Sequence, residues 1–533
     1  MKIKYNKSQH TDVLSRRQFI KTAGIGTLTL MAGGFDSFLT RSAAAFNQNN
    51  HTKPGFVPDL DIALTATPGE VSIFPGNATQ TWQFKAKLLK GDSNRLIKPK
   101  KSYLGPIIRA NKGEKVRIRF KNQIPEETIV HWHGLHVPAI MDGHPRYVIP
   151  MGQSYLYEFE VKNRAGTYWY HPHPHGRTGP QVYSGLAGLF LVSDEEEKAA
   201  GLPTGEYDIP LVIQDRSFDT DNQFVYTSGS RMELMNGFLG KLILVNGMPD
   251  FTLPVSTCAY RLRLLNGSNS RIYKLAWQDN RPLAIIGTDG GLLENPVYRR
   301  YVFLSPGERI ELWADFSGNP IGFETALVSL PFDAGMMNRG RMGRGMMMSG
   351  RTAYNQPLPN GAGFSVFKIK VNKSVKKNQT LPQKLSEFTT FKKSNAVNYN
   401  RPRQFYLTMR HMQWTINGRT FQMEDVADDE IVRLGTHEIW EINNAGGGMG
   451  MMNMMNMPHP IHLHGKQFQV LERSGVTHGG YVDEGWKDTV LLMPGERIRI
   501  LVGFEDYPGL FLYHCHNLEH EDMGMMRNYF VKI

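Results

Sequence analysis

Apolar and polar residues alternate along several short stretches of this chain. The clearest are residues 116–120, 261–264 and 438–442. A period of two is typical of a β-strand that buries one face, so we expect each stretch to be a half-buried strand. All three run up to an asparagine: Asn122, Asn266 and Asn443. Glycine (53 residues) and proline (30 residues) are plentiful along the chain, which suits short strands joined by turns, and no long helix is needed.

The strand pattern occurs three times, which indicates an internal repeat. The first and third copies soon reach a group of histidines, whereas the middle copy reaches residues 270–273, which contain none. Residues 166–173 and 509–516 also resemble each other in pattern. We interpret the chain as one ancestral unit in three copies of roughly 150 residues, a size that suits a β-sandwich, with the middle copy as a spacer.

The domain boundaries are predicted from composition. One falls near residue 200, after the acidic run at 194–198, and the other falls in the Lys- and Asn-rich stretch at 372–385. The predicted units are a leader, 1–45, and three domains, 46–200, 201–375 and 376–533.

The leader has the order of regions that an export signal has. Residues 15–21 (Ser-Arg-Arg-Gln-Phe-Ile-Lys) resemble the twin-arginine motif, and a mildly apolar stretch, 22–34, and small residues, 43–45, follow. The apolar stretch is too short to span a bilayer. We therefore expect a cleaved signal peptide, the twin-arginine export machinery as a partner and a periplasmic location, with no membrane span.

Charge and cysteine content narrow the function classes. The net charge is +12, but the leader alone holds seven Lys or Arg residues against two Asp. The remaining positive charge forms no long run, which argues against a nucleic-acid partner. Two distant cysteines, Cys258 and Cys515, do not make a disulfide framework, and Cys258 is expected to be a buried free thiol.

Histidines gather in four short motifs. These are His131-Trp132-His133, His171-Pro172-His173, the segment from His459 that holds His462 and His464, and His514-Cys515-His516, which is followed by His520 and Met525. In a strand, residues i and i+2 share a face, so each His-X-His pair presents two imidazoles on one side. The eight imidazoles are too many for one ion and suit a cluster of about three. The first and third domains must therefore meet around this cluster.

Cys515 lies between two paired histidines in the chain, so its side chain should point away from the cluster. His459 and His520 lie outside the pairs. A cysteine with two histidines and a weak axial methionine, here Met525, is a blue-copper electron-transfer arrangement. Zinc is the rival metal, but a tetrahedral zinc site would leave the eight paired imidazoles unexplained.

With these motifs the mature chain resembles the multicopper oxidases, of the three-domain bacterial type that includes laccases and periplasmic cuprous oxidases. The resemblance implies an all-β fold of three tandem cupredoxin-like Greek-key β-sandwich domains, a monomer and four copper ions. It also implies an enzyme that oxidises a small reductant one electron at a time and reduces O2 to water. The implied type 1 ligands are His459, Cys515, His520 and Met525. The implied type 2 ligands are His131 and His462, and the implied type 3 ligands are His133, His171, His173, His464, His514 and His516.

Two acids, Asp142 and Glu521, stand where the family has carboxylates near the dioxygen site. Acids there suit a reaction that consumes protons, and the alternative for each is an ordinary loop acid. Asp488 is a candidate for support of the ligands, although its role is not evident from the sequence. Three further histidines break the ligand spacing and are expected either to support the ligands from behind or to be structural: His136, His144 and His175.

The reductant is suggested by methionine, of which the chain has 26. Two segments, 335–348 and 449–457, are rich in it, and thioethers suit Cu(I). A Met-rich insert near type 1 copper is similar to that of the cuprous oxidases. The candidate ligands for substrate copper are Met336, Met337, Met346, Met347, Met455 and Met457.

Two other interpretations of the methionines stay open, core packing and a loop that only blocks bulky reductants. The segments also lack the aspartates of that subgroup, and Arg339, Arg341 and Arg344 would repel a cation. On the strength of the methionines we nevertheless expect a cuprous oxidase in copper tolerance. The second hypothesis is a laccase-type oxidase of phenols or Fe(II), and the third is a copper-free periplasmic scaffold protein.

Overall fold

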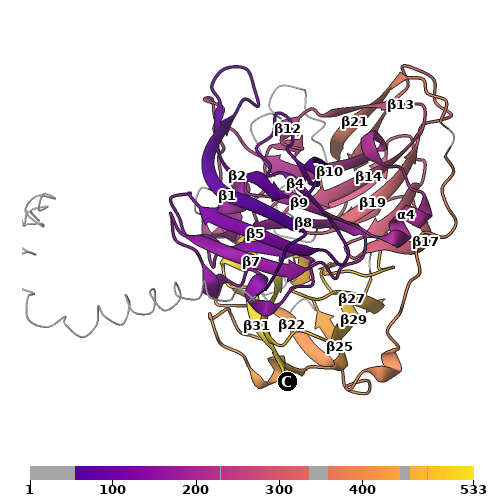
Figure 1. Cartoon of the computed structure of the whole chain (residues 1–533). Coiled ribbons are helices and arrows are strands. Elements are labelled where there is room, and N and C mark those ends of the chain that lie inside the picture. The colour runs from indigo at the N-terminus through magenta and orange to yellow at the C-terminus, as the bar shows by residue number, and fades with distance from the viewer. Residues whose placement is uncertain (1–54, 228–229, 335–357, 378, 445–456, 477) are drawn as a thin grey trace, which may run out of the picture. The chain divides into compact units, whose positions relative to one another are not determined.

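The computed structural model describes residues 55–227, 230–334, 358–377, 379–444, 457–476 and 478–533. Within these residues the chain forms six β-sheets (Figure 1). Among the described residues the longest helices have six residues: α3 (Thr178–Tyr183), α4 (Glu195–Ala200) and α5 (Arg231–Asn236). The other helices in this part of the chain are α6 (Leu518–Asp522), η2 (Ser93–Arg95), η3 (Ala139–Met141), η4 (Pro145–Tyr147), η5 (Gly205–Tyr207), η8 (Lys393–Asn395) and η9 (Asp428–Glu430). The all-β prediction is confirmed.

The first two sheets form what we call the first sandwich. One sheet has the order β2 (Thr79–Lys90), β1 (Leu60–Val71), β5 (Lys115–Asn122), β7 (Ser154–Glu160). The other has the order β3 (Leu96–Ile97), β4 (Ile107–Asn111), β9 (Gly188–Ser193), β8 (Gly166–Pro172), β6 (Val130–His133). One buried apolar cluster draws side chains from both sheets.

The second sandwich is built from two larger sheets. One has the order β12 (Met248–Pro249), β11 (Leu242–Val245), β10 (Asp208–Arg216), β14 (Ala259–Asn266), β19 (Arg309–Asp315), β16 (Leu283–Thr288), β17 (Gly291–Arg299). The other has the order β13 (Thr252–Ser256), β21 (Phe364–Lys373), β20 (Glu324–Ser329), β15 (Tyr273–Trp277), β18 (Val302–Leu304). Their common core includes Cys258, which is a buried free thiol as expected.

The third sandwich ends the chain. One sheet has the order β23 (Gln413–Ile416), β22 (Arg403–Arg410), β25 (Thr436–Asn443), β29 (Arg497–Phe504), β27 (Phe468–Ser474). The other has the order β24 (Ile431–Arg433), β31 (Met526–Lys532), β30 (Gly509–Cys515), β26 (His459–Leu463), β28 (Thr489–Leu492).

The three sandwiches repeat one topology. In each, a parallel pair of strands, β1–β5, β10–β14 or β22–β25, continues into an antiparallel partner. The strands that bear the histidine pairs are also equivalent, because β8 lies between β9 and β6 just as β30 lies between β31 and β26. In the second sandwich β20 and β15 hold these places without a histidine. This agrees with three copies of one unit.

The three asparagines end their strands as expected, with one shift of position. Asn122 and Asn266 are buried, and each side-chain amide donates to two main-chain oxygens, one in the loop that follows and one farther along the chain. In the third copy this is done by Asn444, the residue after the predicted Asn443.

Two of the three predicted half-buried strands are buried on both faces. In β14 the polar residues Arg261 and Arg263 are 1% and 2% exposed. They pair with the acids Glu197, Glu311 and Asp208. In β25, Glu438 and Glu441 are likewise buried against arginines. The prediction of a solvent-facing side was wrong there, because ion pairs with neighbouring segments bury the charged face.

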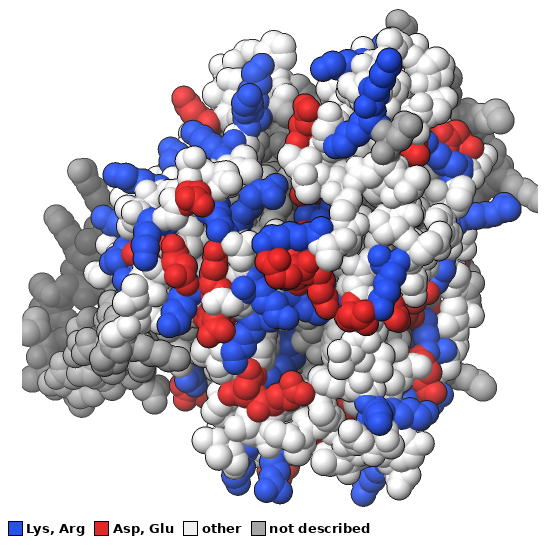
Figure 2. Space-filling view, turned by 45° about the vertical axis from the view of Figure 1, so that its right-hand side comes forward, with Lys and Arg blue, Asp and Glu red and all other residues white. Residues whose placement is uncertain are grey.

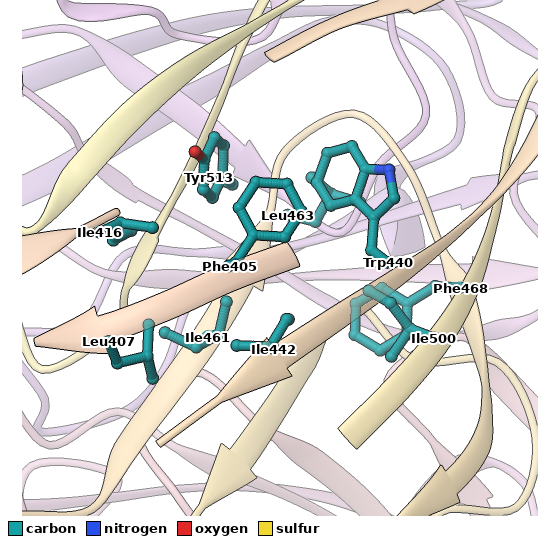
Figure 3. A pocket seen from close by; sticks show the side chains of 10 residues that line it. All are labelled: Phe405, Leu407, Ile416, Trp440, Ile442, Ile461, Leu463, Phe468, Ile500 and Tyr513. Carbon is teal, nitrogen blue, oxygen red and sulfur yellow. The ribbon is translucent and has the colours of Figure 1, made fainter. Parts of the chain in front are cut away.

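The core of the third sandwich shows how the strands aim their histidines. Ile461 and Leu463 of β26 and Tyr513 of β30 point into the apolar interior, opposite Phe405 and Trp440 of the other sheet (Figure 3). Since successive side chains alternate, the histidines between them point out of this core toward the first sandwich.

Surface charge is mixed on the face that Figure 2 shows, where Lys and Arg are interspersed with Asp and Glu. Among the described helices, none is both long and apolar enough to cross a bilayer.

The buried ion pairs of β14 give a test of the packing. We expect Arg261→Ala to lower the free energy of unfolding by about 3 to 5 kcal/mol, because it leaves Glu197 and Glu311 buried with one fewer cation. Lys370→Ala breaks the exposed pair with Glu324 and should cost less than about 1 kcal/mol. Denaturant unfolding measures both, and equal losses would contradict this account of β14.

Candidate metal centre

Eight imidazoles of the first and third sandwiches converge at one place. All eight residues are fully buried: His131, His133, His171, His173, His462, His464, His514 and His516. The Nε2 atoms of His131 and His462 are 3.3 Å apart although the residues are 331 positions apart in the chain. The Nε2 atom of His514 lies 3.0 Å from that of His464 and 3.3 Å from that of His173. The predicted meeting of the two end domains is therefore present.

The pairing of strands sets this convergence. On β6 and β8, His131 faces His171 across the ladder, and on β26 and β30, His462 faces His514. Trp132 and Tyr170 lie in the core of the first sandwich, on the opposite face from the histidines beside them. The apolar core thus anchors each histidine strand from behind.

In most of these rings one nitrogen forms a hydrogen bond with a neighbouring residue, and the other nitrogen faces the remaining histidines of the cluster. His131 Nδ1 bonds the main-chain oxygen of Asp142 at 2.6 Å, and His462 Nδ1 bonds that of Asp488 at 2.8 Å. His464 Nδ1 bonds Asp142 Oδ2 at 2.9 Å. His133 is held in the reverse sense, with Nε2 3.1 Å from Asp488 Oδ1. Such partners fix the tautomer and orientation of metal-binding imidazoles.

The ring nitrogens that form no hydrogen bond are suited to bind a metal ion. His133 Nδ1, His171 Nε2 and both ring nitrogens of His516 are buried without a hydrogen-bond partner in the described part of the chain. Burial lowers the pKa of His131 and His516 well below the usual value and that of His171 to about 3. Neutral imidazoles with free lone pairs are the form that binds transition metals. Unpaired buried nitrogens would otherwise be costly.

A second group of possible ligands lies on the other side of Cys515. Its Sγ atom is 3.4 Å from His459 Nδ1 and 3.7 Å from His520 Nδ1. Met525 is buried in the same apolar core, and its main-chain oxygen accepts from the Cys515 N–H at 3.0 Å. Burial raises the pKa of the Cys515 thiol, so a metal that binds there releases its proton.

Both predicted acids are at the histidine cluster. Asp142 holds His464, and its Oδ1 atom has no hydrogen-bond partner among the described residues. Glu521 lies 3.4 Å from His173 Nε2 and 3.2 Å from His514 Nδ1, and neither of its oxygens has a hydrogen-bond partner within the described ranges. Burial raises the pKa of both carboxyls well above the usual range.

The three histidines that break the spacing lie outside the convergence. His136 bonds Gly465 O and Asp506, and His144 bonds Asn528 Oδ1 at 2.9 Å. His175 is exposed beside Phe421.

Most of the methionines predicted to bind substrate copper are not among the residues that the structure describes. Met336, Met337, Met346, Met347 and Met455 lie outside the described residues. Met457 is 7% exposed and packs in the core of the third sandwich.

Trp414 and Met235 were missed by the sequence prediction. His520 Nε2 and Trp414 Nε1 both donate to the main-chain oxygen of Met235, at 2.8 and 3.0 Å. The Trp414 ring also contacts His459 and His520, with centroids 4.7 and 5.1 Å apart. Neither residue belongs to a His-X-His pair or another recognisable motif, so no signal in the sequence pointed to them.

Comparison with known proteins identifies the family. Two family models described as multicopper oxidase match residues 81–197 and 396–533. A multicopper oxidase of Staphylococcus haemolyticus is 33% identical over 87% of this chain and 87% of its own length. The chain belongs to the multicopper oxidase family. Multicopper oxidases are copper-dependent oxidoreductases that use O2 as the acceptor, so the predictions of family, enzyme class and copper binding are confirmed.

Two further relatives of this multicopper oxidase show the range of the family. The crystal structure of McoA from Aquifex aeolicus superposes with a TM-score of 0.74, at 35% identity, over 90% of this chain and 97% of that one. The cell division protein FtsP of Photorhabdus laumondii is 30% identical over 96% of this chain and 97% of its own length.

Asp142 gives a test of how the cluster is held. We expect Asp142→Ala to lower copper affinity or activity by about 10- to 100-fold, because it removes the acceptor for His464. Copper per chain and O2 uptake measure this. The control is Asp61→Ala, a buried acid of the same sandwich that pairs with Arg119. If both variants behave alike, Asp142 does not support the cluster.

Proposed function

We propose that this multicopper oxidase holds four copper ions. The type 1 ion would be held by His459, Cys515, His520 and Met525. The type 2 ion would be held by His131 and His462, and the type 3 pair by His133, His171, His173, His464, His514 and His516. The observation that carries the proposal is the position of Cys515. Its sulfur faces His459 and His520, whereas the ring of the adjacent His514 faces His464.

The arrangement of these residues suits transfer of single electrons. Bound copper supplies the one-electron redox chemistry and the activation of O2. His514 and His516 flank Cys515, so a single residue step of backbone joins the two groups of ligands. This is a short covalent route. The unpaired carboxylate oxygens of Asp142 and Glu521 are the places where we infer that protons are held for water formation.

For the reductant we propose Cu(I), and for the biological role copper tolerance. The Met-rich segments support this, since one of them leads directly to His459. Burial of the Cys515 group supports it too, because His459 is 1% exposed and His520 is 0% exposed. The main-chain oxygen of Met235 occupies the Nε2 edge of His520, so a bulky phenol cannot bond that edge directly.

The second candidate is a laccase-type oxidase of phenols or Fe(II). Two observations favour it over Cu(I). Met457 is packed in a core rather than at a surface. The chain between Ala445 and Met457 contains no acid that would attract a cation, which favours a phenol over either metal ion.

Oxygen uptake by the purified, copper-loaded enzyme separates these candidates. We expect fast uptake with Cu(I), slow uptake with a methoxyphenol and no blue absorption or uptake in Cys515→Ser. Cys258→Ser, which also removes a buried thiol, should match the wild type. A faster rate with the phenol would make the enzyme a laccase. Wild-type uptake no faster than Cys515→Ser would overturn the electron-transfer proposal.

We also propose that the chain is exported to the periplasm by the twin-arginine machinery and that its leader is cleaved. Residues 1–45 lie outside the described residues, and the proposal rests on their sequence. Replacing Arg16 and Arg17 by Lys together should leave the full-length chain inside the cell. Fractionation and the mass of the N-terminal peptide check this, and normal export of the double variant would refute it.

A further inference from the structure

The second sandwich, which has no histidine pair, reaches the histidine cluster through one turn. The turn joins β18 to β19 and contains Gly307, whose φ is +85°. A Cβ atom on Gly307 would lie 2.9 Å from His516 Cδ2 and 3.1 Å from His133 Cε1. The backbone of the second sandwich therefore lies directly against two rings of the cluster.

Arg309 follows this turn as the first residue of β19, and all five N–H groups of its guanidinium donate hydrogen bonds. It is 0% exposed. Nε donates to Thr167 O at 2.9 Å, Nη1 to Gly307 O at 2.9 Å, and Nη2 to Asp289 O at 2.9 Å. The remaining two N–H groups form a fork on Asp488, with Nη1 2.7 Å from Oδ1 and Nη2 2.5 Å from Oδ2. One side chain thus links all three sandwiches, since Thr167 belongs to the first and Asp488 to the third.

Asp488, which Arg309 holds, in turn contacts two histidines of the cluster. Its Oδ1 atom is 3.1 Å from His133 Nε2, and its main-chain oxygen is 2.8 Å from His462 Nδ1. The neighbouring Thr489 hydroxyl reaches the same two nitrogens, at 3.2 and 3.1 Å. The two rings are stacked, with centroids 3.7 Å apart and planes at 12°. The orientation of both rings therefore depends on where Asp488 is held.

The chemistry of the fork makes Arg309 hard to replace. A planar guanidinium holds both oxygens of a carboxylate at once, whereas a lysine ammonium is a point charge on a flexible stem. Without the fork, Asp488 Oδ1 is free to turn away from His133. Partners of this kind behind metal ligands typically change metal affinity or activity by about 10- to 100-fold.

We propose that Arg309 is a positioning residue of the copper cluster, which fixes His133 and His462 through Asp488, so that the second sandwich completes the site. The proposal rests on the assignment of His133 and His462 as copper ligands. It gives the second sandwich a part in the chemistry, where the sequence had suggested only a spacer.

The experiment compares Arg309→Lys with Arg263→Lys in the full-length, copper-loaded enzyme. Arg263 is also buried, and it forms ion pairs with Asp208 and Glu311, neither of which holds a histidine of the cluster. The readouts are copper per chain, the blue absorption, the electron paramagnetic resonance of the copper that is not blue, O2 uptake and the unfolding midpoint.

We expect Arg309→Lys to change the resonance of the non-blue copper and to lower kcat by about 10- to 100-fold. Its blue absorption should stay, and its unfolding midpoint should fall no further than that of Arg263→Lys. A resonance and kcat equal to those of Arg263→Lys would overturn the proposal.

Asp488→Asn serves as the second variant and decides the matter if Arg309→Lys does not accumulate as folded protein. It keeps the size of the side chain but puts an amide where the fork needs an oxygen, and it should give the same altered resonance. A wild-type resonance in Asp488→Asn would refute the role of this pair. A wild type without blue absorption or bound copper would instead refute the proposed function itself.

Discussion

The constraint on which this molecule depends is the alternation of side chains along strands that are packed on one face. In β26, Ile461 and Leu463 are buried in the core of the third sandwich, and His462 between them points to the other side. Trp132 does the same for His131 and His133 in β6. The apolar side chains fix the strand against the core, and the strand thereby fixes the position of each histidine. The same alternation separates Cys515, which lies on the core side with His459, from His514. Two chemically different groups of ligands can therefore share one strand.

Burying so many polar and charged side chains at one site would be unfavourable if they had no partners. Here each group is held by a neighbour, and that neighbour is held by another. Asp142 and Asp488 each hold two of the imidazoles. Asp488 is itself held by Arg309, and Lys487 beside it pairs with Asp289 and Glu308. Charged groups that would each be unfavourable alone in the interior are matched in this way, and the matching extends across the three sandwiches.

The sequence predicted the fold and the first layer of the site because both have local signals. A period of two marks a strand, and His-X-His places two imidazoles on one face. The predictions that were wrong concern longer distances. The charged faces of β14 and β25 looked exposed, since the acids and arginines that bury them come from other segments. The sequence did not indicate a role for Arg309 or Trp414, because their partners lie far away in the chain. For the same reason Asp488 was a candidate whose role could not be assigned. Only packing brings such residues together.

The 331 residues that separate His131 from His462 have a consequence for the order of events in biogenesis. Each half of the cluster belongs to a different sandwich, so neither sandwich alone brings all eight imidazoles together. The cluster comes into existence only when the first and third sandwiches have docked. The complete cluster is therefore formed late, and a chain whose sandwiches fail to dock never becomes an enzyme, however well each sandwich folds.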